Sequence, residues 1–133
     1  MEIRSQNDLT GFGFAKDYDA VVTVRAGGGE QRFALEYERS AKPMRYYRDV
    51  AGALAREAHV SHVLYLVSNY DLLQFISGFF PSSRCRVLFG LAKDWHAQLL
   101  DMSVSCCAAA RSVRFRETFD VANTHRQPAA VSS

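Results

Sequence analysis

Two segments joined by a run of glycines constrain the fold of this chain more than any other feature. Residues 19–25 are rich in Val and Thr, a composition typical of a β-strand. Residues 31–38 alternate between apolar and polar side chains, which predicts a second strand with one apolar face. Gly27–Gly29 lies between them and suits a tight turn. The sequence therefore predicts two strands that fold back on each other.

Three carboxylates fall at one end of this predicted hairpin. Asp19 opens the first strand, and Glu36 and Glu38 lie near the end of the second. Side chains two residues apart share one face of a strand, so the two glutamates can hold an ion between them. Because magnesium prefers oxygen ligands, we predict Asp19, Glu36 and Glu38 as ligands of Mg²⁺ or Mn²⁺. Lys42 follows closely and is predicted to stabilise the charge that develops on a phosphate.

The same residues have a purely structural interpretation. Glu36 and Glu38 can form the solvated face of an edge strand and pair with Arg25 or Arg32 across the hairpin. Asp19 can simply begin its strand. The sequence alone leaves both interpretations open.

The rest of the chain alternates between helical and extended patterns. Helices are predicted over residues 43–58 and 70–80, and strands over residues 62–68 and 85–91. Residues 99–119 suggest a further strand pair, or a strand and a turn. The order strand, strand, helix, strand, helix, strand predicts an α/β fold with a mixed sheet flanked by helices.

Length and composition place this fold in a single domain. The chain has 133 residues, of which 48% are hydrophobic, enough to bury a core. We expect residues 1–123 to form the domain and residues 124–133 a disordered tail. An odd count of 3 cysteines, with no signal-like N-terminus, predicts a cytoplasmic protein. No apolar run approaches the roughly 20 residues that span a membrane, and no phosphate-binding glycine loop is present.

Basic side chains gather immediately after the second predicted strand. The formal net charge of +2 is too small to indicate nucleic acid by itself. Arg39, Arg45 and Arg48, however, lie close together in the sequence. They are predicted to contact a phosphate backbone, with an ordinary solvated helix face as the alternative.

The acidic run and the helix after it resemble a known family. Asp19, followed by Glu36-Tyr37-Glu38 and a helix, resembles the active-site core of the PD-(D/E)xK nuclease superfamily. The run Leu35–Arg48, followed by Val63–Val67, is similar to the nuclease-like domain of replication-relaxation proteins from plasmids and mobile elements. This resemblance covers about residues 17–95. It implies a restriction-endonuclease-like core that hydrolyses the phosphodiester bonds of DNA with Mg²⁺ or Mn²⁺. It also makes a homodimer a candidate assembly.

Two positions depart from the pattern of that superfamily. Tyr18 stands where a proline usually precedes the first acid, and Glu38 stands where a lysine usually follows the second. Lys42 is a candidate for the displaced positive charge. The departures keep an alternative open, in which the chain is a catalytically inactive member of the fold. Such a protein would bind DNA or another protein in plasmid replication, plasmid transfer or host interaction.

Overall fold

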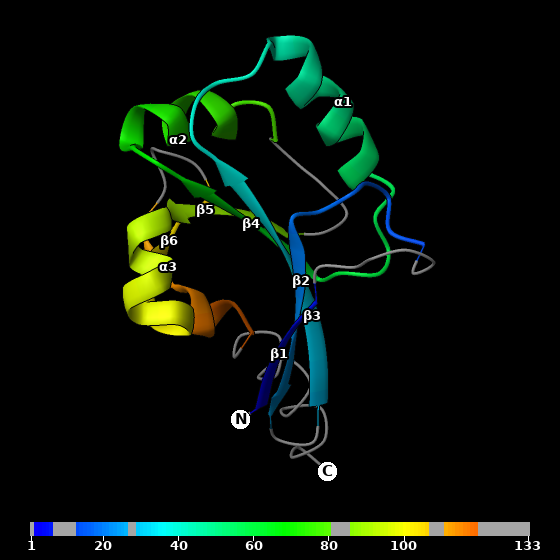
Figure 1. Cartoon of the computed structure of the whole chain (residues 1–133), viewed down its shortest axis with the longest axis vertical. Coiled ribbons are helices and arrows are strands. Elements are labelled where there is room, and N and C mark those ends of the chain that lie inside the picture. Colours follow the sequence, from blue (N-terminus) through cyan, green and yellow to red (C-terminus); the bar gives the residue numbers. More distant parts are fainter. Residues whose placement is uncertain (1, 7–12, 27–28, 81–85, 107–110, 120–133) are drawn as a thin grey trace.

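A mixed β-sheet forms the centre of the molecule. The computed structural model describes residues 2–6, 13–26, 29–80, 86–106 and 111–119. Within them, the main sheet has the order β1-β2-β3-β4-β5 (Figure 1). The strands are β1 (Glu2–Gln6), β2 (Ala20–Ala26), β3 (Gly29–Glu38), β4 (His62–Val67) and β5 (Arg86–Leu91). β2 is antiparallel to both β1 and β3, whereas β4 is parallel to both β3 and β5. The predicted α/β class with a mixed sheet is confirmed.

Two crossover helices pack against one face of the sheet. α1 (Met44–Leu54) connects β3 to β4, and α2 (Tyr70–Ser77) connects β4 to β5. The side-chain oxygen of Asn69 caps α2 by accepting a hydrogen bond of 2.9 Å from the N–H of Leu72. The core on this face includes buried side chains of both helices and of β4, among them Tyr47, Leu54, Leu73, Ile76 and Tyr65.

The opposite face of the sheet packs against the last part of the described chain. This part contains α3 (Ala92–Gln98), the 3₁₀ turn η1 (Leu99–Asp101) and the short strands β6 (Ser103–Val104) and β7 (Val113–Arg114). Phe33 of β3 and Phe115 meet edge to face, with ring centroids 4.8 Å apart. The sheet therefore lies between two apolar cores, with α1 and α2 on one side and α3 on the other (Figure 1).

A glycine allows β5 and the segment of β6 to approach closely. A Cβ atom on Gly90 would lie 2.4 Å from the methyl carbon of Met102 and 3.1 Å from the carbonyl oxygen of Ser103. Next to it, Phe89 and Ser105 exchange backbone hydrogen bonds of 2.8 and 3.0 Å. A larger residue at position 90 would therefore require the methyl end of Met102 to move and would crowd the carbonyl oxygen of Ser103.

The observed elements follow the predicted order, and several boundaries differ. β2, β3, α1, β4, α2 and β5 occur in that order. α1 ends at Leu54 and not at residue 58, and beyond it the N–H groups of Arg56 and Glu57 bond to carbonyl oxygens three residues earlier, in a tighter turn. The strand pair predicted within residues 99–119 is confirmed only as β6 and β7, and α3 is not among the predicted elements. The predicted tail over residues 124–133 lies outside the described residues. In the described part, no helix combines the length and apolar character needed to cross a membrane.

Candidate active site at the carboxyl end of strand β3

Two buried glutamates end strand β3. β3 is a central strand between β2 and β4, and its parallel register places Glu36 opposite Tyr65 and Glu38 opposite Val67. Only 5% of Glu36 and 6% of Glu38 is exposed. The interpretation as a solvated edge strand is therefore wrong. The acid that pairs with Arg25 is Glu30, at 2.7 Å.

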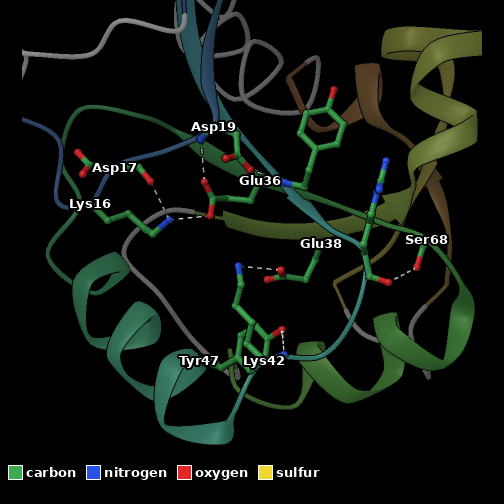
Figure 2. Close-up of polar contacts among 10 residues, drawn as sticks. Lys16, Asp17, Asp19, Glu36, Glu38, Lys42, Tyr47 and Ser68 are labelled. Carbon is green, nitrogen blue, oxygen red and sulfur yellow. Dashed lines mark hydrogen bonds and ion pairs between the residues drawn. The ribbon is translucent and has the colours of Figure 1, made fainter.

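Asp19 and Glu36 lie side by side where the β2–β3 ladder ends (Figure 2). The backbone N–H of Asp19 donates to Oε1 of Glu36 at 3.0 Å. In return, the N–H of Tyr37 donates to Oδ2 of Asp19 at 2.7 Å. These bonds continue the pairing of the two strands beyond Ala20, with carboxylates in place of backbone carbonyls. The two strands therefore bring together two of the carboxylates that the sequence nominated.

Lys16 completes this group. Its Nζ lies 2.6 Å from Oε2 of Glu36 and also donates to the carbonyl oxygen of Asp17 at 3.0 Å (Figure 2). Burial raises the pKa of Glu36, and the ammonium of Lys16 opposes that rise without cancelling it. With side-chain exposures of 14% for Lys16 and 7% for Glu36, the ion pair is largely screened from solvent. Lys16 is not among the residues nominated from the sequence. The sequence indicates Lys16 only by its position three residues before Asp19, and the segment around it has no clear periodicity.

Glu38 and Lys42 form a separate ion pair. Nζ of Lys42 lies 2.8 Å from Oε1 of Glu38, and it also lies 4.5 Å from the ring centroid of Tyr46. The hydrogen bond that Lys42 donates to Glu38 is the main cause of the raised pKa of Lys42. The backbone N–H of Lys42 donates to the hydroxyl of Tyr47 at 3.0 Å. The structure therefore places Lys42 with Glu38, and it places Lys16 with Glu36 (Figure 2).

The predicted basic residues follow this end of β3 in the chain and lie on the surface. Arg39, Arg45 and Arg48 are all exposed. The carbonyl oxygen of Arg39 accepts a hydrogen bond of 2.7 Å from the hydroxyl of Ser68, which fixes the chain as it leaves β3. Among the described residues, no ion pair engages these three guanidinium groups, so they can meet an anionic ligand. Beside Arg39, a cavity of about 410 Å³ is lined by residues that include Tyr37, Glu38, Ser68 and His96.

The carboxylates fit a magnesium ion as a pair and not as a triad. Within the described residues, no group of three or more His, Cys, Asp or Glu side chains is placed to hold a metal ion. Asp19 and Glu36 remain as an adjacent pair, and Glu38 contacts Lys42. Magnesium is often bound through one or two carboxylates, with water in the other positions. The pair Asp19 and Glu36 fits that mode of binding.

A buried hydroxyl close to the glutamates has no hydrogen-bond partner within the described part of the chain. Tyr65 is fully buried on β4, opposite Glu36, and its Oη is unpaired. Burial raises the pKa of Tyr65, and the nearby charge of Glu36 adds to the rise. Tyr65 therefore stays neutral beside the two acids.

Comparisons of the chain with protein-family models, with curated proteins and with solved structures find no match.

Proposed function

We propose that this α/β protein is a metal-dependent phosphodiester hydrolase that acts on DNA. The observation that carries the proposal is the meeting of Asp19, Glu36 and Lys16 at the carboxyl end of β3. Two acids and a lysine are the set that the PD-(D/E)xK motif supplies, and Lys16 would provide the lysine from a different point in the chain. The proposal includes the restriction-endonuclease-like core that the sequence resemblance implies.

The residues of the site divide the task between them. Asp19 and Glu36 would hold Mg²⁺ or Mn²⁺, which polarises a phosphate and lowers the pKa of a bound water. Lys16 lies against Glu36, where its ammonium would stabilise the negative charge of the transition state. Arg39, Arg45 and Arg48 would grip the phosphate backbone on either side of the scissile bond. Lys42 keeps the buried carboxylate of Glu38 neutralised and orders the start of α1.

The biological setting follows from the same resemblance. The substrate would be DNA of a plasmid or another mobile element, and the protein would act in the cytoplasm. One site cuts one strand, so a homodimer would be needed to cut both strands.

The test is cleavage of supercoiled plasmid DNA with Mg²⁺ or Mn²⁺. Asp19→Asn and Glu36→Gln should each lower the rate of nicking at least about 100-fold, and Lys16→Met should do the same if it stabilises the transition state. Glu30→Gln is the matched control, because Glu30 is an exposed acid paired with Arg25 and Arg32. Nicking that persists in Glu36→Gln would contradict the proposal. Glu38→Gln tests the number of carboxylates in the site: an unchanged rate of nicking would indicate two, and a lost rate would indicate three.

A second candidate function is a catalytically inactive DNA-binding or protein-binding factor. The observation that favours it is the pairing of each buried glutamate with a lysine, since Glu38 occupies the usual lysine position and contacts Lys42. Such a protein would bind DNA without cutting it, and Mg²⁺ would not raise its melting temperature. Replacing Arg45 and Arg48 together with glutamine should reduce the slope of log K against log salt by about 0.9 for each phosphate that is no longer neutralised. Failure to bind any nucleic acid at low salt would leave protein binding as the remaining role.

A further inference from the structure

A second cleft lies at the amino ends of the parallel strands, at the opposite end of the sheet from Asp19 and Glu36. Its volume is about 550 Å³, and it is open to solvent. The residues that line it come from the first residues of β3, β4 and β5 and from the segment before β4. They include Arg32, His59, Ser61, His62 and Arg86.

Backbone pairing fixes the two arginines on either side of Ser61. The N–H of Ser61 donates to the carbonyl oxygen of Arg32 at 2.9 Å, and the N–H of Arg86 donates to the carbonyl oxygen of Ser61 at 3.1 Å. The hydroxyl of Ser61 also donates to the carbonyl oxygen of Arg32 at 3.0 Å, and it lies 2.6 Å from Nδ1 of His62. Three adjacent strands therefore present two guanidinium groups and a hydroxyl around one cleft.

The cleft carries a positive charge that is only partly neutralised. Among the described residues that line it, Glu30 is the one acid, and its carboxylate is shared between Arg25 at 2.7 Å and Arg32 at 3.8 Å. Arg86 is exposed and has no ion pair within the described part of the chain. His62 is buried, and burial together with the charge of Arg86 lowers its pKa to about 4. At neutral pH the positive charge therefore comes from the arginines.

We propose that this cleft binds a phosphate group, with Arg32 and Arg86 as the charged ligands. A guanidinium group offers a planar fork of N–H donors that matches two phosphate oxygens. The phosphate can belong to a free anion such as a nucleotide or to the backbone of a nucleic acid, and the chemistry of recognition is the same. None of the residues of the proposed active site takes part, so phosphate binding here stands even if that site does not cut DNA.

The test is a pair of NMR titrations of the whole chain, one with inorganic phosphate and one with a short single-stranded oligonucleotide. At least one of the two probes should shift the backbone signals of Arg32, Ser61 and Arg86 in a saturable way. The Arg32→Gln/Arg86→Gln variant should bind at least about 10-fold more weakly, since neither glutamine can make a charge-assisted hydrogen bond to the phosphate. Lys93→Gln, which removes an exposed charge from α3, should bind as the wild type does.

The two probes also separate the two sources of the phosphate. Saturation by inorganic phosphate alone assigns the cleft to a free anion, whereas saturation only by the oligonucleotide assigns it to a nucleic-acid backbone. The titration of His62 reports separately on the charge of Arg86. Its midpoint should rise in Arg86→Gln, because that substitution removes a charge that disfavours protonation. Unchanged signals with both probes, or equal binding by wild type and the double variant, would overturn the proposal.

Discussion

The ion pair between Lys16 and Glu36 leads to a quantitative prediction for Lys16→Met. Methionine keeps most of the volume of the lysine and leaves Glu36 with the N–H of Asp19 as its remaining donor among these contacts. Removing one partner of a buried pair costs about 3–5 kcal/mol when the other partner stays charged. Glu36 can lower this cost by taking up a proton and becoming neutral. From its ordinary pKa of 4.5, this costs about 3.4 kcal/mol at pH 7, at about 1.36 kcal/mol per unit. Because burial already raises the pKa of Glu36, we expect the variant to lose about 2–3 kcal/mol.

The pH dependence of this loss follows from the sign of the pKa shift. A carboxyl with a raised pKa binds its proton more tightly in the folded state, so stability falls as pH rises from 4.5 through the pKa of the folded state. Lys16→Met raises that pKa further and extends the fall to higher pH. The difference between variant and wild type should therefore shrink to under about 1 kcal/mol near pH 4.5. Urea unfolding followed by circular dichroism at pH 7 and pH 4.5 measures both differences.

Two further variants make this test specific. Adding Glu36→Gln to Lys16→Met replaces the unpaired acid with a neutral amide that still accepts the N–H of Asp19, and most of the lost stability should return. Lys42→Met also leaves a buried glutamate without its lysine, but it should cost less than Lys16→Met, because the Lys42 side chain is 45% exposed and the Lys16 side chain only 14%. An equal loss at both pH values, or a double variant as unstable as the single one, would refute the reasoning.

Three other predictions concern buried groups. Glu57→Gln should cost about 1–3 kcal/mol, because the hydroxyl of Tyr18 donates to this buried carboxylate at 2.5 Å. Burial opposes ionisation of Glu57, but its hydrogen bonds lower its pKa below 4.5, so the variant should lose less stability than wild type during acid unfolding. His62 should titrate by NMR near pH 4, and stability should fall by about 3 kcal/mol as pH drops from 6.5 to that value; a midpoint above 6 would contradict its burial. Gly90→Ala should lower stability by about 1–3 kcal/mol through contact with Met102, and an unchanged urea midpoint would contradict the close approach of β5 and β6.

The order of the elements could be predicted from the sequence because it depends on local patterns. β2, β3 and β4 each have apolar side chains that suit one strand, and Asn69 gives α2 a recognisable start. The pairing of strands is a different matter, because it depends on contacts between distant residues. β1 shows no clear periodicity of its own and forms only by pairing with β2. α3 is one short helix of 7 residues that directly follows β5, and its sequence gives a weak helical signal.

The acidic residues of the candidate site could be predicted from the sequence, but the lysine that pairs with Glu36 could not. The sequence indicates Asp19 and Glu36 because one precedes a strand and the other lies near the end of its antiparallel partner, and the strands bring them together. The burial of Glu36 and Glu38 was not predictable, because a strand that ends in two glutamates resembles a solvated edge. Lysines make that burial tolerable, and one of them, Lys16, reaches Glu36 across 20 positions of the sequence. Such a contact leaves no periodic signal.

The parallel strands have a further consequence for any extended ligand. β4 has 6 residues, so its two ends lie about 17 Å apart, at about 3.3 Å per step. Successive phosphates of one stacked DNA strand are about 3.4 Å apart along the helix axis. Glu36 lies opposite Tyr65, three residues beyond His62 at the amino end of β4, so the cleft and the acids are separated by about 10 Å, or about three nucleotide steps. A DNA strand with one phosphate bound in the cleft would contact the acids only if it covered this distance. The spacing along β4 would therefore set the length of the shortest oligonucleotide that contacts both places.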